Sequence, residues 1–443
     1  MKENEENWIL FSIIGKGRER RDGARGYEKT RYVFNTKDKD KYITRETAFF
    51  GLALLEYLKE VEQLSIDKFI IVGTDKSAWS ELLMVIPHEQ QNDSMSDLYL
   101  KVYEQENAKT EKEALTDEML KEWEAALKKF LPFLSLHMVK PLDFKVYLDI
   151  ILKELEIGKK YSIVFDCTHG FRYIPIVFSY ALMFSKYLRN IDKIRIFYGA
   201  FEMKDYSLPG ENYPLAIEVG FVNEAVKLIE AMSIFENSGY FTPLLDCIGI
   251  DNTEETYFKI EMNRPLKKEV EDIMHRLKDT KQKAENYYEK EISDYLLKEF
   301  EEMQKQDRLY LRMFKRAQFF FERNQYFKAL ILLYEAIIVL FADVYGIKDL
   351  MNYKSREKSR NMIKNEIKQI SEYKSPEKNK LIKSDDEVDI YRKLEYIRNA
   401  AAHGSEARTD QNLLHSPQAF KELFESACEL FSKMLKRKEV KAI

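Results

Sequence analysis

The stretch SIVFDCTHGFRYIP, residues 162–175, holds the change of pattern that decides the fold of the first half of this chain. Its apolar run stops at Asp166, and a helical pattern begins near Arg172. The turn between them carries a hydroxyl, an imidazole and a glycine, on Thr168, His169 and Gly170. A buried strand that ends in a short polar turn before a helix is the repeating unit of an α/β sheet.

The same alternation extends on both sides of this stretch. Apolar runs at residues 8–15, 68–74 and 193–202 predict strands. Residues 44–61 and 172–189 repeat apolar side chains at helical spacing. Strands that alternate with helices at this rhythm predict an α/β domain with a mostly parallel sheet.

The second half of the chain has a different pattern. From Leu215 onward, apolar residues recur at helical spacing with few glycines or prolines, so we expect an all-helical half. Residues 354–389 are the most polar stretch and predict a helix and a solvated loop. A chain of 443 residues has room for two or three domains. We therefore predict an α/β domain at residues 1–214, a helical connector at 215–300 and a helical domain at 301–443.

Composition and charge narrow the classes of function. Hydrophobic residues make up 45% of the chain and charged residues 33%, which is typical of packed domains with charged surfaces. No apolar run reaches the ~18–20 residues that cross a bilayer, and the N-terminus lacks a signal-peptide pattern, so we expect a cytoplasmic protein. The net charge of -4 gives no global field that attracts nucleic acid, although local basic patches remain open. The three cysteines have no CxxC spacing and the six histidines no HExxH arrangement, so neither a disulfide framework nor a metal site is predicted.

Three strand-end turns supply the candidate ligand-binding residues. In a parallel sheet these turns meet at the carboxyl edge, where ligands of such sheets bind. Glycines that allow close backbone approach, hydroxyls and free helix N-terminal amides favour a phosphate or a ribose. The plainer alternative is that Asp166 and Thr168 only cap a helix, and that the basic segment at residues 18–31 is a flexible solvated loop. The predicted ligand-binding residues are Gly15, Gly17, Gly73, Thr74, Lys76, Ser77, Asp166, Thr168, His169, Gly170 and Arg172.

A second motif, RNAAAHG, occupies residues 398–404 near the other end of the chain. A spacing of five residues on a helix turns Arg398 and His403 about 140° apart, and Gly404 predicts the end of that helix. The three alanines between them predict a face that another helix or a substrate backbone can approach closely. A guanidinium that holds a phosphate and an imidazole that moves protons suit phosphodiester cleavage without a metal. The plainer alternative is a histidine favoured by the helix dipole and an arginine in a surface ion pair.

The pentapeptide from Asp166 to Gly170 resembles the DxTHG pattern of CRISPR-associated proteins that begin with a CARF domain, a Rossmann-like sensor of cyclic oligoadenylates. The flanking VGTDKSAW (72–79) and FYGAFE (197–202) are similar to the same family, and the likeness covers residues 8–214. This resemblance implies that the ligand at the sheet edge is a cyclic tetra- or hexa-adenylate, which acts as an allosteric activator rather than as a cofactor.

The segment from Arg398 to His403 resembles the Rx4-6H pattern of HEPN ribonucleases, and the preceding residues 319–346 are similar to the helical core of that family. A CARF half followed by a HEPN half is the arrangement of type III CRISPR ancillary ribonucleases. The resemblance implies a homodimer, or a higher oligomer, that cleaves single-stranded RNA without a metal and leaves a cyclic phosphate and a 5′-hydroxyl. In this scheme His403 transfers the proton, Arg398 stabilises the developing negative charge, and Asn399 orients one or both.

Two hypotheses of different classes follow. The first is an RNA endonuclease that a cyclic oligoadenylate activates by shifting the population toward a competent pair of helical domains. The second is a nucleotide-sensing module whose helical half only dimerises or recruits a partner. Cleavage of the activator by the α/β half, assisted by His169 or Lys76, is compatible with the first hypothesis.

Overall fold

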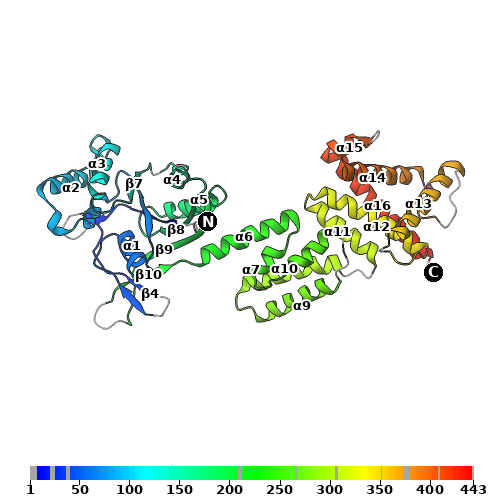
Figure 1. Ribbon diagram of the computed structural model, residues 1–443, viewed down its shortest axis with the longest axis horizontal. Coiled ribbons are helices and arrows are strands. Elements are labelled where there is room, and N and C mark those ends of the chain that lie inside the picture. The colour runs from blue at the N-terminus through cyan, green and yellow to red at the C-terminus, as the bar shows by residue number, and fades with distance from the viewer. Residues whose placement is uncertain are drawn as a thin grey trace, which may run out of the picture. The chain divides into compact units, whose positions relative to one another are not determined.

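A computed structural model describes two compact units in this chain, residues 1–226 and 227–443, which we call the α/β unit and the helical unit (Figure 1). The basic segment predicted at residues 18–31 lies partly outside the described residues, because 20–24 are not among them. The structure describes residues 7–19, 25–35, 40–140, 142–207, 212–262, 264, 267–304, 308–350, 352–373, 380–407 and 410–441.

The α/β unit is built around one mixed sheet, which has eight strands within the described residues. The strands β9, β8, β1, β6 and β7 are adjacent in this order and parallel, and β10 pairs antiparallel with β9. β6, the next parallel strand after β1 in the chain, lies on one side of β1. β8, which comes later in the chain, lies on the other side of β1, so the strand order reverses at β1. In sheet order the strands are β5 (Lys41–Ile43), β4 (Val33–Asn35), β10 (Pro214–Glu218), β9 (Asn190–Lys204), β8 (Lys160–Asp166), β1 (Asn7–Ile13), β6 (Ile66–Gly73) and β7 (Leu134–Met138).

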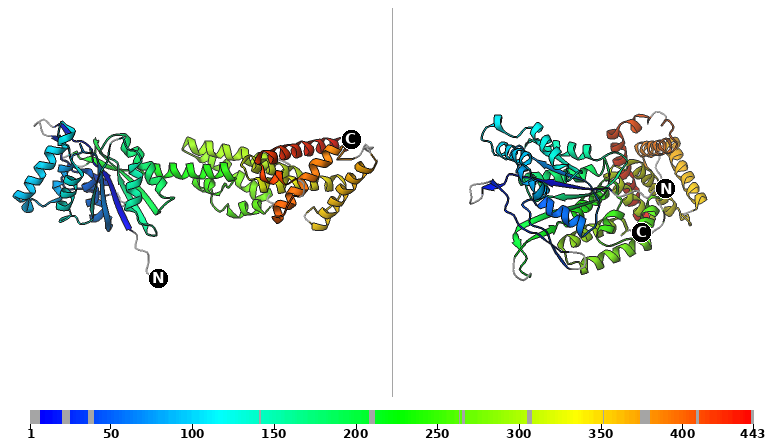
Figure 2. Two further views of the ribbon diagram at one scale, coloured as in Figure 1. Left: turned by 90° about the horizontal axis from the view of Figure 1, so that it is seen from above. Right: turned by 60° about the vertical axis from the view of Figure 1, so that its left-hand side comes forward.

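Helices cover both faces of this sheet (Figure 2). Along β1, Leu10 packs in a cluster with α1 and α3, whereas Ile9 and Phe11 pack in a second cluster with α4 and α5. Both faces of β1 are therefore buried, which explains why its sequence is continuously apolar rather than alternating. The helices of this unit are α1 (Phe50–Glu60), α2 (Asp93–Glu106), α3 (Asp117–Leu127), α4 (Val146–Glu154) and α5 (Tyr173–Ser185).

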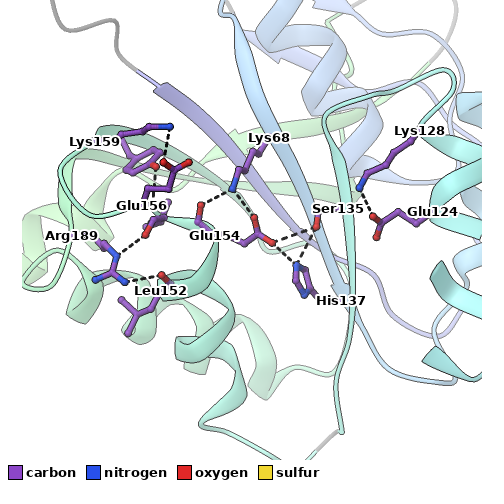
Figure 3. Close-up of polar contacts among 12 residues, drawn as sticks. Lys68, Glu124, Lys128, Ser135, His137, Leu152, Glu154, Glu156, Lys159 and Arg189 are labelled. Atoms are coloured by element: carbon purple, nitrogen blue, oxygen red, sulfur yellow. Dashed lines mark hydrogen bonds and ion pairs between the residues drawn. The ribbon is translucent and has the colours of Figure 1, made fainter. Parts of the chain in front are cut away.

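A charged cluster fastens the edge strand β7 to its neighbours. Glu154, at the end of α4, lies between Lys68 on β6 and His137 on β7 (Figure 3). Its carboxylate oxygens are 2.9 Å from Lys68 Nζ and 2.8 Å from His137 Nε2. The hydrogen bond from His137 has the largest effect on the pKa of Glu154. Together with the bond from Lys68 it lowers that pKa to about 2, although burial alone would raise it. The carboxylate therefore links one helix to two strands and stays ionised.

The helical unit packs around α12. Every residue of α12 from Leu332 to Ala342 is buried, as expected for a helix surrounded on all sides. The helices α11, α13, α14 and α16 each contact it. The helices are α6 (Phe221–Ser238), α7 (Thr242–Cys247), α8 (Glu254–Glu261), α9 (Lys267–Lys283), α10 (Tyr287–Gln304), α11 (Leu309–Glu322), α12 (Tyr326–Val344), α13 (Tyr353–Tyr373), α14 (Asp385–His403), α15 (Asn412–His415) and α16 (Pro417–Lys441).

The predicted fold class is confirmed, because a mostly parallel α/β unit precedes a unit whose described residues form only helices. The prediction of helix from Leu215 is wrong at its start. Residues 214–218 form β10, which pairs with β9 on one side and β4 on the other, and the helix begins at Phe221. Strand pairing within the sheet thus overrides the local helical spacing. The predicted polar helix is α13, and residues 374–379 after it lie outside the described residues.

Candidate functional site

The three predicted turns do lie at one edge of the sheet. They follow β6, β1 and β8, which are adjacent, parallel and in register along most of their length. This is the edge at which the strand order reverses, and ligands of open α/β sheets bind at such a point. The structure therefore brings the eleven predicted ligand-binding residues into one region.

The turn after β8 is braced from inside. Asp166 is fully buried and accepts hydrogen bonds from the Ser12 hydroxyl on β1 and from the Thr168 N–H, the latter at 2.8 Å. Burial raises the pKa of Asp166 to about 6, although these bonds act in the opposite direction. The Thr168 hydroxyl in turn accepts the Gly199 N–H of β9 at 2.8 Å. Both side chains thus hold the turn between three strands, and neither caps α5, whose N-cap residue Arg172 makes no side-chain cap bond.

Two glycines let the turns after β1 and β8 touch. A Cβ on Gly15 would lie 2.3 Å from the backbone nitrogen of Gly170. Gly170 itself has a φ of +92°, and a Cβ there would lie 2.6 Å from Ile13. Neither position accepts a side chain without moving the backbone. Gly17 likewise packs on Gly26 of β3 (Arg25–Gly26), where a Cβ would come within 2.4 Å.

His169 is a stacked, neutral side chain in this structure. Its ring lies between Tyr27, at a centroid distance of 4.2 Å, and Phe49, at 5.4 Å. Its Nε2 accepts the backbone N–H of Phe50 at 3.3 Å. Removal from solvent by these rings lowers the pKa of His169 to about 3. An imidazole with this pKa carries no charge near neutral pH and is a weak base, so its role here is that of an aromatic surface.

Tyr27 is a residue of this site that the sequence reasoning missed. Its hydroxyl donates to the Gly15 carbonyl at 2.5 Å and accepts the Gly15 N–H at 2.8 Å. Burial raises the pKa of this hydroxyl well above its usual value. Tyr27 therefore fixes the backbone at Gly15 while its ring stacks on His169. The available signal was an aromatic residue within an otherwise polar loop after the first strand.

The turn after β6 uses its hydroxyls internally. Ser77 donates to the Ile14 carbonyl at 2.8 Å and accepts the Thr74 N–H at 2.8 Å, and both residues are buried. Lys76 donates to the Ala108 carbonyl at 2.6 Å. Gly73 gives room to Ile14, Ser77 and Trp79, all within 3 Å of a Cβ built there.

The exposed groups along this edge are two cations and a glycine backbone, whereas the hydroxyl and carboxylate groups described above are bonded within the chain. Lys16, next to Gly15, and Arg172, two residues after Gly170, are both exposed. Gly170 is itself exposed, so its backbone is accessible. Two cations beside an exposed glycine turn suit a ligand with several phosphates.

The terminal motif lies at the end of α14. Ser384 accepts the Glu387 N–H at 3.3 Å at the start of this helix, and Gly404 ends it with a φ of +63°, as predicted. His403 is exposed in the last turn and, among the described residues, makes no hydrogen bond or ion pair. An exposed imidazole at a helix end can reach a second molecule.

Arg398 is set deeper than His403. Its Nη1 donates to Asn399 Oδ1 at 2.9 Å, and its Nη2 is 3.7 Å from Glu335 on α12. The guanidinium also lies over the ring of Tyr334, 5.3 Å from its centroid. Its side chain is 24% exposed, so it keeps access to solvent. The structure thus brings Arg398 and Asn399 together, and His403 makes no hydrogen bond to either of them.

The predicted alanine face is only partly correct. Ala400 is buried and Ala401 packs against the core, so Ala402 is the one alanine of the three that is exposed. The 140° spacing explains this, because the residues between Arg398 and His403 wrap around the helix rather than share a face. His415 ends the short helix α15, and its Nε2 lies 3.0 Å from the Gln411 side-chain nitrogen.

Within the described residues, no three His, Cys, Asp or Glu side chains are grouped closely enough to hold a metal ion. Nor does any helix in those ranges combine the length and the apolar character needed to cross a membrane.

Comparison with known proteins identifies the α/β unit. Residues 9–202 match the family described as CRISPR system endoribonuclease Csx1, CARF domain. A CRISPR-associated protein of Methanocaldococcus jannaschii is 22% identical over 422 residues, which is 89% of this chain; the chain spans 62% of that relative's length. A solved structure of Csm6 from Enterococcus italicus, bound to cyclic hexa-2'-fluoro-hexa-dAMP, aligns with 98% of this chain and with 94% of the Csm6 chain. The sequence identity is 14% and the TM-score is 0.37. Residues 9–202 therefore match a CARF domain, and most of the chain is similar to a CRISPR-associated protein.

Proposed function

We propose that this protein is a single-stranded RNA endoribonuclease that a cyclic oligoadenylate activates and that needs no metal. The observation that carries the proposal is the end of α14. There an accessible guanidinium on Arg398, held by Asn399, precedes an exposed imidazole on His403 in an Rx4-6H pattern. The CARF domain supports the same function, since the family that it matches is described as an endoribonuclease.

The proposed reaction uses only side chains of the chain itself. Arg398 binds the scissile phosphate and stabilises the charge that develops on it. The ribose 2′-oxygen attacks that phosphorus and gives up its proton, and the 5′-oxygen leaves and takes up a proton, with His403 as the transferring group. The products are a 2′,3′-cyclic phosphate and a 5′-hydroxyl. Asn399, which accepts a hydrogen bond from Arg398, fixes the guanidinium.

In the proposed function, two copies of the chain together form the catalytic site. Within one chain His403 makes no hydrogen bond to Arg398, and it is exposed together with Asn399 and Ala402. Two copies that place these exposed faces together would supply two arginines and two histidines to one groove. Assemblies larger than a dimer remain compatible with this arrangement.

The activator in the proposal is a cyclic tetra- or hexa-adenylate at the carboxyl edge of the sheet. Lys16 and Arg172 would hold its phosphates, and the exposed backbone at Gly170 would allow close approach. Adenine rings would pack beside Tyr27 rather than on His169, because the imidazole already lies between Tyr27 and Phe49. The proposal assigns no cleavage of the activator to His169 or Lys76, because the first is a weak base and the second donates to Ala108.

The test is cleavage of a labelled single-stranded RNA by the full chain, with and without cyclic tetra- and hexa-adenylate. We expect cleavage to depend on one of these ligands, to persist in EDTA and to yield cyclic phosphate ends. RNA that stays intact with every ligand would refute the ribonuclease. Cleavage at the same rate with and without every ligand would refute activation by a cyclic oligoadenylate. Loss of cleavage in EDTA would refute the claim that the reaction needs no metal.

One observation keeps a second function open. Arg398 lies near Glu335, as a purely structural arginine in an ion pair would. In that case the helical unit would only assemble or recruit a partner. Arg398→Ala would then change the oligomeric state measured by light scattering and leave RNA turnover, if there is any, unaffected.

A further inference from the structure

Three arginines converge on one buried carboxylate beside the terminal motif. Glu335 of α12 is 5% exposed. Its Oε2 is 2.6 Å from Arg356 Nη1, and its Oε1 is 3.2 Å from Arg360 Nη2 and 3.7 Å from Arg398 Nη2. Arg356 and Arg360 belong to α13, the polar helix that the sequence marked out, and Arg398 belongs to α14.

The three arginines differ in how fully they are used. Arg356 donates through Nε to the Leu350 carbonyl at 2.8 Å and through Nη1 to Glu335, so it holds the start of α13. Arg360 makes a single hydrogen bond among the described residues, the one to Glu335, and its Nε is buried without a partner. Arg398 is only loosely paired with the same oxygen, and its Nε is also without a partner. A guanidinium has five donors, so Arg360 and Arg398 both retain unused ones.

Positive charge exceeds negative charge in this cluster. One carboxylate serves three guanidinium groups, and adding Glu395, which accepts a hydrogen bond from the Tyr334 hydroxyl at 3.1 Å, still leaves one cation uncompensated. A half-buried cation without a full counter-charge loses part of its hydration, which costs free energy. An anion at the open side of the cluster would remove that cost, and the side chains of Arg360 and Arg398 are each 24% exposed.

We propose that Arg360 is a second phosphate-binding residue of the RNA site and that Glu335 is a positioning residue for both guanidinium groups. Since Arg360 and Arg398 share the oxygen Oε1, the two cations lie side by side. Arg398 then takes the scissile phosphate and Arg360 takes a neighbouring phosphodiester of the same strand. The inference rests on the proposed function for its substrate, and it adds a residue that the RNAAAHG motif does not contain.

The experiment measures binding of a 2′-O-methyl RNA strand, which cannot be cleaved, to the activator-bound full chain at several salt concentrations. The variant is Arg360→Gln, and the matched control is Lys358→Gln, which removes one exposed cation from the same helix. For Arg360→Gln we expect about 10-fold weaker binding and a salt dependence reduced by about 0.7 in slope, the value for one phosphate contact on a single strand. The control should behave as the wild type. Cleavage of ordinary RNA by Arg360→Gln should show a raised KM and a smaller change in kcat.

A second variant covers the case in which Arg360→Gln does not fold. Arg360→Lys keeps the charge and the pairing with Glu335 but loses the planar fork, so we expect weaker binding with an unchanged salt slope. Equal affinity and slope for both arginine variants and the control would overturn the inference. A wild type that cleaves RNA while these variants are unaffected refutes this inference alone. A wild type that binds the methylated strand through Arg360 but cleaves no RNA refutes the proposed function alone.

Discussion

The polar residues of the sheet edge and those at the end of α14 are organised in opposite ways. At the sheet edge, hydrogen bonds within the chain satisfy the conspicuous side chains, as in the chain of contacts from Ser12 through Asp166 and Thr168 to Gly199. At the end of α14, Arg398 keeps unused donors and His403 is exposed without a partner among the described residues. We call the sheet edge the closed region, because its polar side chains find their partners within the chain. We call the end of α14 the open region, because donors there lack partners among the described residues.

This difference separates two kinds of motif. The DxTHG residues shape a closely bonded turn, so under the proposed function the ligand would be held by backbone groups and by the flanking cations Lys16 and Arg172. Under the proposed function, the RNAAAH residues would present their chemistry directly and would depend on a second chain and a substrate. Substitutions in the first region should therefore act through geometry and stability, and those in the second through chemistry at unchanged stability.

The largest effect is expected at the open region. His403→Ala and Arg398→Ala should each lower RNA cleavage by about 10²–10⁴-fold, because each removes a proton-transfer or charge-stabilising group. For His403→Ala the melting temperature should stay within error of the wild type, since the side chain is exposed. His275→Ala, a substitution of another exposed histidine in the helical unit, is the control and should retain full activity. Wild-type turnover in His403→Ala would show that this region is not the catalytic one.

The next effect tests whether the closed region acts through its backbone. In Gly15→Ala the new methyl would lie 2.3 Å from Gly170, so the two turns must separate. We expect the activator concentration for half-maximal cleavage to rise at least ~10-fold, and stability to fall by about 1–3 kcal/mol. Gly220→Ala, where nothing lies within 4 Å of the added Cβ, should match the wild type in both assays. An unchanged response to activator in Gly15→Ala would mean that the contact between the turns does not shape the binding edge.

The sequence indicated which strands and turns would meet but not how their side chains would be used. Asp166 and Thr168 were correctly placed at the sheet edge, because the carboxyl ends of parallel strands lie at one edge of a sheet. That Thr168 would bond to Gly199, 31 positions away, depends on β9 lying beside β8, which no local pattern specifies. Tyr27 was missed for the same reason, since only the folded loop brings its ring onto His169.

The terminal motif also shows that local sequence patterns do not specify contacts between distant residues. The end of α14 at Gly404 was predictable from local chemistry, and the αL backbone there confirms it. The depth of Arg398 was not, because it depends on Glu335 and Tyr334 of α12, more than 60 positions earlier. Local spacing therefore singled out Arg398 and His403 as candidates, and tertiary packing determined that Arg398 is held while His403 is exposed.

A smaller effect concerns the pH dependence of the α/β unit. Glu106 is 3% exposed and accepts the N–H and hydroxyl of Ser80; burial raises its pKa to about 8. A folded-state pKa above the unfolded value means that the folded chain binds the proton more tightly, so stability falls as pH rises from about 4.5 to 8. Asp166 contributes in the same direction only up to about pH 6. Glu106→Gln, which mimics the neutral acid, should flatten the decrease in melting temperature between pH 6 and 8, and an unchanged slope would contradict this origin.

The smallest effect is expected at the edge strand, where the Glu154 cluster includes none of the predicted site residues. Glu154→Gln removes the charge that joins Lys68 and His137, so we expect a loss of about 1–2 kcal/mol at pH 7 with the activator response intact. Because the pKa of Glu154 is lowered to about 2, its contribution is present above about pH 4.5 and is lost as pH falls toward 2. The melting temperatures of wild type and variant should therefore converge in acid. Glu156→Gln is the matched control, since its pair with Lys159 is exposed and should contribute almost nothing; equal losses for both variants would show that burial of the Glu154 cluster is not what strengthens it.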